Sequence, residues 1–201
     1  MSSASIYLAS GSPRRRELLQ QIGVPFQVVG AAVDETVLPG EDSAAYVARL
    51  AAAKADAGWE QTGGAGRLPV LAADTAVVLD GTILGKPANR PDGEGMLRRL
   101  SGRTHEVWTA IALRTAAGLR CKISRSEVTF RSIDADEVRS YWETGEGLDK
   151  AGAYAIQGRG AVFIADLRGS FSGVMGLPLF ETAELLSDAG VPYWQSDGAL
   201  R

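Results

Sequence analysis

Residues 8–19 read LASGSPRRRELL, an apolar strand end that passes through a Gly/Ser turn into a helix. Pro13 suits the first helical position, where its missing N–H costs nothing, and Ser12 suits the N-cap. The two leucines that close the stretch give the helix an apolar face for packing on a sheet. This order of strand, tight turn and helix is typical of an α/β fold.

The turn at residues 10–15 has the features of an anion-binding site. Free backbone N–H groups and the positive end of the helix dipole converge at the start of a helix. Arg14 and Arg15 add permanently charged donors, which grip phosphate through paired hydrogen bonds. The alternative is an ordinary turn with solvated basic residues, which we favour less because cations are unfavourable at a helix N-terminus. We interpret the turn as a phosphate cradle.

The overall composition limits the partners of the protein. Its 201 residues include 21 Lys and Arg against 24 Asp and Glu, so the formal net charge is −3 and a global basic surface for nucleic acid is missing. A single cysteine, Cys121, leaves no internal disulfide, and a single histidine, His105, leaves no multi-histidine metal site. The first residues lack a secretory pattern, and no apolar run approaches roughly 20 residues. We expect a cytoplasmic protein with no nucleic-acid or membrane partner.

Hydrophobic periodicity and turn signals predict strands that alternate with helices. Strands are expected at 6–9, 25–30, 69–79, 81–84, 104–113, 119–130 and 161–167. Helices are expected from 13 onward, from 42 or 43 to 58, and at 91–100, 134–145 and 178–190. Early alternation followed by a hairpin region indicates a mixed α/β fold. We expect one domain over residues 1–201, because no linker or repeat is visible.

Two charged residues fall within apolar patterns. The helix expected from residue 42 has an apolar stripe, made of Tyr46, Val47, Leu50 and Ala51, and the next position on that stripe is Lys54. A lysine there is equally well explained as a surface residue whose stem covers apolar groups. Asp74 interrupts the apolar run at 69–79. A buried carboxylate needs a partner or a function, so we favour a functional role over a capping role for Asp74.

A lysine is fixed between glycine and proline in Gly85-Lys86-Pro87, which aims its side chain. The candidates then comprise four cations and two carboxylates: Arg14, Arg15, Lys54 and Lys86, with Glu35 and Asp74. Mg²⁺ takes one or two carboxylates together with phosphate oxygens. This balance suits a nucleoside triphosphate with a divalent metal better than a monophosphate or a polymer.

Motifs along nearly the whole chain resemble the Maf family of nucleotide pyrophosphatases. The matching segments are 8–15, 34–35, Lys54, 73–75, 85–87, 101–105, 150–158 and 176–179, in this order. The resemblance implies an elongated, two-lobed α/β fold around a central twisted mixed sheet with a cleft, similar to inosine triphosphate pyrophosphatases. It also implies hydrolysis of a nucleoside triphosphate to monophosphate and pyrophosphate, dependent on a divalent metal such as Mg²⁺, Mn²⁺ or Co²⁺.

The resemblance also implies a role for each site residue. Asp74 would orient and deprotonate the attacking water, and Glu35 would hold the metal together with Asp74. Arg14, Lys54 and Lys86 would offset the charge that develops on the phosphate oxygens. The substrate-binding residues would be Ser10, Ser12, Arg14, Arg15, Thr75, Lys86, Tyr154 and Gln157. Within the family, Tyr154 and Gln157 look like the subfamily that acts on dTTP and UTP.

Several alternatives stay open at this stage. The same cradle would serve a nucleotide-binding regulator of cell division without turnover, or a pyrophosphatase for a modified purine triphosphate such as 7-methyl-GTP. The oligomeric state is also open, with a homodimer as one option. Gly173 stands where the family pattern has asparagine, which leaves the contact of that asparagine undefined. We assign His105 to a structural strand entry rather than to catalysis.

Overall fold

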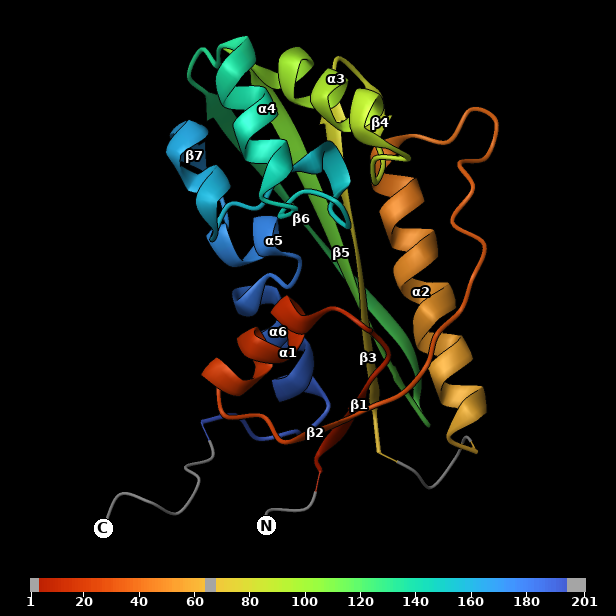
Figure 1. Cartoon of the computed structure of the whole chain (residues 1–201). Helices are drawn as coiled ribbons and strands as arrows, with labels where there is room; N and C mark the ends of the chain where they lie inside the picture. Colours follow the sequence, from red (N-terminus) through yellow and green to blue (C-terminus); the bar gives the residue numbers. More distant parts are fainter. Residues whose placement is uncertain (1–3, 64–67, 195–201) are drawn as a thin grey trace, which may run out of the picture. The chain divides into compact units, whose positions relative to one another are not determined.

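The computed structural model describes residues 4–63 and 68–194 (Figure 1). The strands are β1 (Ile6–Leu8), β2 (Phe26–Val28), β3 (Val70–Leu79), β4 (Thr82–Leu84), β5 (Thr104–Thr115), β6 (Gly118–Phe130) and β7 (Ile164–Arg168). The helices are α1 (Pro13–Gln21), α2 (Ser43–Gln61), α3 (Arg90–Leu100), α4 (Ala135–Glu143), α5 (Phe171–Met175) and α6 (Leu179–Asp188), with 3₁₀ turns η1 (Ala151–Ala153) and η2 (Arg159–Phe163). None of the helices within these ranges combines the length and the apolar character that crossing a membrane requires.

The strands form one mixed sheet, which confirms the predicted α/β class. Their order is β2-β1-β3-β5-β6-β7, and β4 pairs with β3. The pairs β1–β2 and β1–β3 are parallel, whereas β3–β4 and β6–β7 are antiparallel. The strand expected at 161–167 was partly wrong, because residues 159–163 form η2 and the strand begins at Ile164. The short helix α5 was not predicted at all.

Strand β1 is the point at which the direction of winding reverses. It lies between β2 and β3 and pairs in parallel with both. The chain passes through α1 to β2 on one side, and then through α2 to β3 on the other. In open α/β sheets, ligands bind beyond the carboxyl ends of the strands at such a reversal. The Gly/Ser turn follows β1 at this end, so the fold places it where a ligand is expected.

Helix α2 is held firmly at both ends. Asp42 caps its start, since the side chain accepts a hydrogen bond from the Ala45 N–H at 2.8 Å. Near its end, a Cβ on Gly58 would lie 2.9 Å from Ala9 Cβ and 2.9 Å from Val70 Cγ1. Only glycine therefore lets the helix approach β1 and β3 this closely. The close approach fixes which side chains of α2 face the sheet.

The chain divides into two compact units. The first comprises residues 1–74, 109–123 and 176–201, and the second comprises 75–108 and 124–175. Three of the four boundaries fall within β3, β5 and β6, so these strands contribute residues to both units, and the fourth follows α5. In the first unit, Arg15 Nε donates to the carbonyl of Gly176 at 2.8 Å, which brings the start of α1 to the segment before α6.

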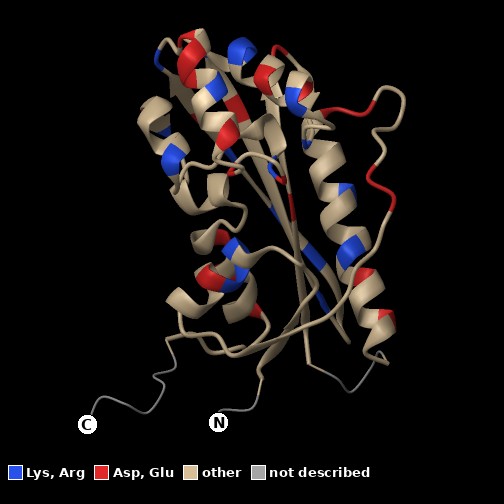
Figure 2. Ribbon diagram, in the orientation of Figure 1, with Lys and Arg blue, Asp and Glu red and all other residues tan. Residues whose placement is uncertain are grey.

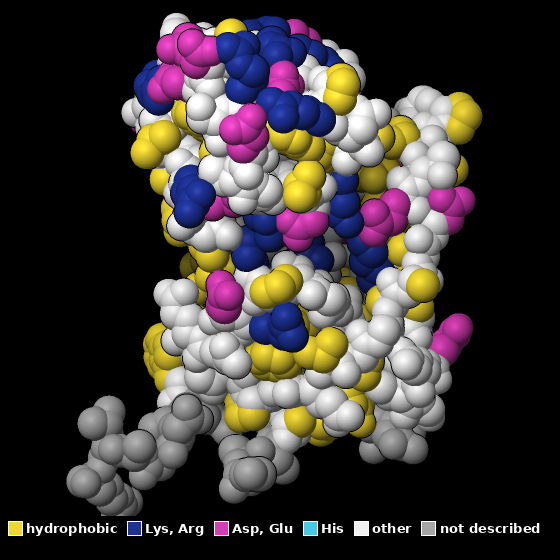
Figure 3. All heavy atoms as spheres, in the orientation of Figure 1, with side chains coloured by type: hydrophobic (Ala, Val, Ile, Leu, Met, Phe, Trp, Pro, Cys, Tyr) yellow, Lys and Arg dark blue, Asp and Glu magenta, His cyan; other side chains and the backbone are white. Residues whose placement is uncertain are grey.

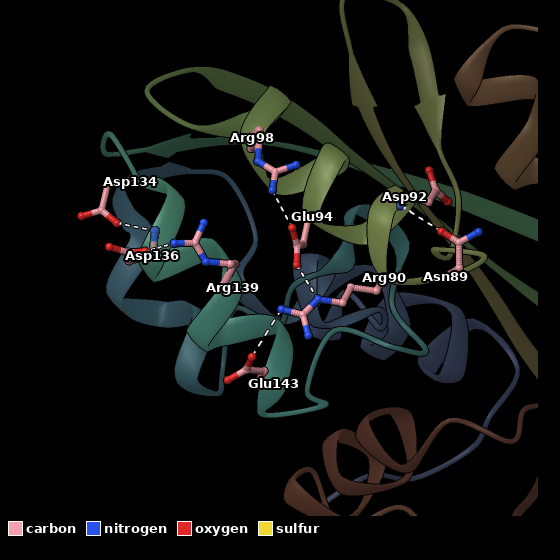
Figure 4. A network of polar contacts seen from close by, with 9 residues as sticks. All are labelled: Asn89, Arg90, Asp92, Glu94, Arg98, Asp134, Asp136, Arg139 and Glu143. Atoms are coloured by element: carbon pink, nitrogen blue, oxygen red, sulfur yellow. Dashed lines mark hydrogen bonds and ion pairs between the residues drawn. The ribbon is translucent and has the colours of Figure 1, made fainter.

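The second unit has its own apolar core beneath α3 and α4. Gly93 of α3 packs directly on the ring of Trp142 of α4, which is 8% exposed. A polar network covers this contact: Glu94 accepts from Arg90 at 2.7 Å and from Arg98 at 2.5 Å, as Figure 4 shows. Arg90 also reaches Glu143 of α4 at 3.3 Å. Figure 3 shows the resulting mixture of both charge signs over these helices, which is typical of a solvated face.

His105 lies in the core of the second unit rather than at its surface. It is 1% exposed, and its Nε2 is 2.8 Å from the hydroxyl of Tyr154. The two rings and that of Phe130 meet edge to face, with centroids 4.8 to 5.4 Å apart. Burial lowers the pKa of His105 to about 4, so the ring is neutral near neutral pH. Its position agrees with the structural role expected from the sequence.

Replacing Gly93 with alanine should destabilise the protein although alanine is the better helix former. The added Cβ would lie 1.9 Å from Trp142 Cζ3, and overpacking of this kind costs roughly 1–3 kcal/mol. Gly95→Ala, two residues away on α3, meets nothing within 4 Å and should stabilise by up to about 1 kcal/mol. Urea unfolding of both variants measures the difference. Equal stability of the two variants would contradict the packing of α3 on Trp142.

The buried His105 should make stability depend on pH. The pKa is about 4 in the folded protein and 6.5 when the ring is solvated, so only the unfolded chain takes up this proton between those values. The free energy of unfolding is therefore unaffected by this group above pH 6.5. It decreases as the pH falls toward 4, by up to about 3 kcal/mol. In His105→Gln, the decline in unfolding free energy over this range should be smaller. The ring signals of this single histidine report its pKa directly by NMR, and titration near 6.5 would refute the burial.

Candidate active site

The Gly/Ser turn is organised by the hydroxyl of Ser10. Ser10 is 8% exposed, and its Oγ accepts from the Ser12 N–H at 3.3 Å and from Arg15 Nη1 at 3.0 Å. Ser12 occupies the N-cap position of α1, as expected, but its side chain makes no capping hydrogen bond. The first N–H groups of α1 are thus left without a side-chain acceptor from the cap, which keeps them available to an anion.

The two arginines of the turn have different surroundings. Arg15 is committed to the protein through Ser10 and the carbonyl of Gly176. Burial lowers the pKa of Arg15 to about 10, although the negative charge of Asp74 acts to raise it. The guanidinium therefore remains charged at neutral pH. Arg14 is partly buried, and its side chain has no hydrogen bond or ion pair within the described part of the chain. Arg14 is therefore the arginine whose donors are open to a ligand.

Lys54 joins the two predicted carboxylates. Its Nζ lies 2.5 Å from Glu35 Oε1 and 2.7 Å from Asp74 Oδ1. The side chains of Lys54 and Asp74 are 11% and 10% exposed, so Lys54 is not a surface lysine. Glu35 is 47% exposed and lies on the open side of the group. The structure thus brings together three of the residues selected from the sequence.

Asp74 occupies an environment suited to proton transfer. Burial raises its pKa above the ordinary value, and the neighbouring Lys54 ammonium opposes that rise. The register pairs Leu8 of β1 with Leu71 of β3, so Asp74 lies three residues farther along β3, beyond the end of β1. This is the same end of the parallel strands from which the Gly/Ser turn begins. The charge of Arg15 is close enough to affect the pKa of Asp74.

The segment that carries Glu35 is fixed by side chains of α2 that the sequence analysis did not select for this role. The Tyr46 hydroxyl donates to the Glu35 carbonyl at 3.0 Å. Arg49 donates to both oxygens of Glu41, at 2.6 and 2.8 Å, and to the Thr36 carbonyl at 3.0 Å. Figure 2 shows the acidic residues along the segment before α2 and the basic residues on the helix. Tyr46 was expected on the apolar stripe, but it is only partly buried because its hydroxyl serves this contact.

The remaining predicted residues belong to the second unit. Thr75 directly follows Asp74 on β3, where successive side chains point to opposite faces. Lys86 is exposed in the turn after β4, and this turn is fixed because the Gly85 carbonyl accepts from the Gly152 N–H at 3.1 Å. Gln157 is exposed, whereas Tyr154 is 5% exposed with its hydroxyl bonded to His105. Gln157 is thus open to a ligand, and Tyr154 supports the segment from the core.

Gly173 lies within α5, where space is limited. Its N–H donates to Ser170 Oγ at 2.9 Å, and an added Cβ would lie 3.0 Å from Ser170 Cβ and 3.4 Å from Ser124 Oγ. A larger residue would therefore require Ser170 to move.

The two carboxylates fit the ligand set of a divalent metal shared with a substrate. Glu35 and Asp74 converge on one cationic atom, Lys54 Nζ. Within residues 4–63 and 68–194, no group of three or more His, Cys, Asp or Glu gathers that could hold an ion. The described residues therefore do not form a metal site made of protein ligands alone. Mg²⁺ takes one or two carboxylates and completes its shell with phosphate oxygens and water, which matches this pair.

Comparison with known proteins places the chain in a family. The model of the family described as Maf-like protein matches residues 5–189. A dTTP/UTP pyrophosphatase of Aromatoleum aromaticum is 53% identical over 94% of this chain and 97% of its own length. A protein of the same name from Nitrosospira multiformis is 52% identical, again over 94% and 97%.

A solved nucleoside-triphosphatase (dITP/XTP pyrophosphatase) of Mycobacterium abscessus is 19% identical over 92% of each chain, with a TM-score of 0.43. The match over residues 5–189 and the relatives above 50% identity agree with the motifs found along the sequence. The chain belongs to the Maf family of Maf-like proteins.

Proposed function

We propose that this chain hydrolyses nucleoside triphosphates, with dTTP and UTP as preferred substrates, to nucleoside monophosphate and pyrophosphate. The observation that carries the proposal is the group beyond the end of β1 in which the nearly buried Lys54 joins the nearly buried Asp74 to the exposed Glu35. Relatives about half identical over almost their whole length bear the name dTTP/UTP pyrophosphatase, which supports the choice of substrate. The open donors of Arg14 and of the α1 N-terminus suit the triphosphate.

In the proposed mechanism, Asp74 accepts the proton of the attacking water at its carboxylate. Its raised pKa makes it a better base at neutral pH than a solvated carboxylate. Lys54 holds Asp74 in position and, with Arg14 and Lys86, offsets the charge that develops on the phosphate oxygens. A divalent metal held by Glu35 and Asp74, of which Mg²⁺, Mn²⁺ and Co²⁺ are candidates, supplies Lewis-acid stabilisation when bound. Gln157 contacts the edge of the base.

The second candidate function is nucleotide binding without turnover, as in a regulator. A binding protein needs no general base, and a nearly buried carboxylate with a raised pKa is suited to that role. The presence of Asp74 beside the cradle therefore favours hydrolysis over binding alone. We further propose that the enzyme acts in the cytoplasm without nucleic acid, and that a homodimer is the assembly to test.

The products distinguish the proposed reaction from other cleavages. Attack at the α-phosphorus should release pyrophosphate and monophosphate from dTTP and UTP, with no nucleoside diphosphate. In ¹⁸O-labelled water, the label should enter the monophosphate, as measured by mass spectrometry. Initial release of orthophosphate would contradict the proposal, and faster turnover of 7-methyl-GTP or inosine triphosphate would contradict the substrate assignment.

Asp74→Asn should abolish most turnover while keeping shape and binding. Loss of a general base lowers rates by roughly 10²- to 10⁴-fold, whereas affinity for a non-hydrolysable dTTP analogue should hold or rise because a negative charge disappears. Arg14→Ala should weaken both affinity and turnover, because it removes a donor used in the ground and transition states alike. Single-turnover rates and calorimetry measure the two effects.

The matched control for this prediction is Asp56→Asn, also on a residue of the first unit. Asp56 is 48% exposed and lies 3.4 Å from Arg114, away from the Lys54 group, so turnover should be unchanged. Near-normal turnover of a well-folded Asp74→Asn protein would place the base elsewhere, and Glu35 would be the next residue to replace.

A further inference from the structure

The segment from Tyr154 to Gly160 forms a short loop with the exposed Gln157 at its tip. Residues on both sides of the tip are buried, including Ala155, Ile156 and Gly160. A side chain that reads a base must be held to within a fraction of an ångström, and a loop does not provide this precision unless its ends are fixed. The contacts at the ends of this loop therefore bear on the selectivity of the site.

The two ends of the loop are bound by two side chains that are hydrogen-bonded to each other. Glu146 accepts from the Arg159 N–H at 2.8 Å through Oε1 and from the Gly160 N–H at 2.9 Å through Oε2. The Tyr141 hydroxyl donates to Glu146 Oε2 at 2.8 Å and accepts from the Ala155 N–H at 3.2 Å. Tyr141 and Glu146 thus link the beginning of the loop, before Gln157, to its end.

The glycines of this region show how tightly the loop closes. A Cβ on Gly160 would lie 2.8 Å from the Ala155 carbonyl oxygen and 2.9 Å from the Tyr141 hydroxyl. A Cβ on Gly158 would lie 2.1 Å from Glu146 Oε1. No residue with a side chain fits at either position while Tyr141 and Glu146 keep their places. The loop and the two side chains are therefore built as one unit.

The charge state of the pair is settled by the same contacts. Burial by itself would raise the pKa of Glu146, but the pKa is lowered because hydrogen bonds from the Arg159 and Gly160 N–H groups and the Tyr141 hydroxyl, with the charge of Lys150, together outweigh burial. Burial raises the pKa of Tyr141, so its hydroxyl stays protonated. An ionised acceptor and a neutral donor give charge-assisted hydrogen bonds, which are stronger than neutral ones.

We propose that Tyr141 and Glu146 are positioning residues that set base selectivity by fixing the loop that presents Gln157. The proposal rests on the proposed function, because it requires Gln157 to contact the base. Thymine and uracil present an acceptor at the position where cytosine presents an amino donor. An amide held in one orientation distinguishes these two edges, whereas an amide on a loosened loop can turn to suit either.

The test measures kcat and KM of the full chain for dTTP and dCTP in Tyr141→Phe and Glu146→Gln. Tyr141→Phe keeps the ring and its edge-to-face contact with Phe163, at 5.1 Å between centroids, but removes both hydroxyl contacts. We expect kcat/KM for dTTP to fall roughly tenfold and that for dCTP to change little, since one lost hydrogen bond to a charged group is worth about a factor of ten. The ratio between the two substrates should fall by the same factor.

The matched control is Glu143→Gln, which makes the same chemical change three residues before Glu146. Glu143 is 64% exposed, and its side chain pairs with Arg90, so the substrate ratio should match that of the unaltered chain. A double-mutant cycle completes the design: in a Gln157→Ala background, Tyr141→Phe should cause no further loss of selectivity.

The outcomes separate this inference from the proposed function. A uniform loss of activity toward both nucleotides, or an additive loss in the Gln157→Ala background, would show that the pair is merely structural and overturn the inference alone. An unaltered chain that releases no pyrophosphate from either nucleotide would overturn the proposed function, and the inference with it.

Discussion

The arrangement of the first unit depends on one ammonium group shared by two carboxylates. Lys54 Nζ lies within 2.7 Å of both Glu35 and Asp74, although Lys54 and Asp74 are almost completely buried. Burying such charges is expensive, and apolar side chains of the same size would stabilise a core at least as well. The cost of this group is consistent with the catalytic role that we propose for Asp74. The group also requires that α2, β3 and the segment before α2 keep their positions.

The fold meets this requirement through backbone geometry. Gly58 lets α2 lie against β1 and β3, which sets the height of Lys54 above the sheet. The parallel pairing of β1 with β3 sends the Gly/Ser turn and Asp74 to the same end of the sheet. Glu35 does not lie in a helix or strand. Its segment is positioned instead by hydrogen bonds from Tyr46 to the Glu35 carbonyl and from Arg49 to the Thr36 carbonyl. Each group of the site thus has a separate support.

In the second unit, the loop at 154–160 is also positioned by hydrogen bonds with side chains. In this loop, the N–H groups of Ala155, Arg159 and Gly160 need acceptors from side chains. A carboxylate from Glu146 and a hydroxyl from Tyr141 supply those acceptors. The same contacts leave Gln157 exposed at the tip. Tyr154 adds a further attachment to the core through His105.

The sequence by itself determined the family, the order of the strands and of most helices, and the candidate residues Glu35, Lys54 and Asp74 that the structure brings together. Periodicity and capping are local properties, so α2 with its Asp42 cap and α4 with its capping box were predicted nearly to their ends. The motif at residues 8–19 placed the cradle because strand, turn and helix start are contiguous in the chain. Local signals did not distinguish the 3₁₀ turn η2 from the strand β7 that follows it, because a short apolar run is compatible with either structure.

Only the tertiary structure decided which charges meet and which side chains position them. Lys54 could not be told from a surface lysine until α2 was placed on the sheet, because burial depends on residues far away in the chain. Arg15 is hydrogen-bonded to Ser10 and Gly176, whereas the donors of the adjacent Arg14 remain available to a ligand. The sequence cannot show this difference, because both residues are arginine. The side chains that position the candidate residues form hydrogen bonds with the backbone of other segments; they are Tyr46, Arg49, Tyr141 and Glu146. Every residue has backbone groups, so a sequence does not show which of them will be bonded.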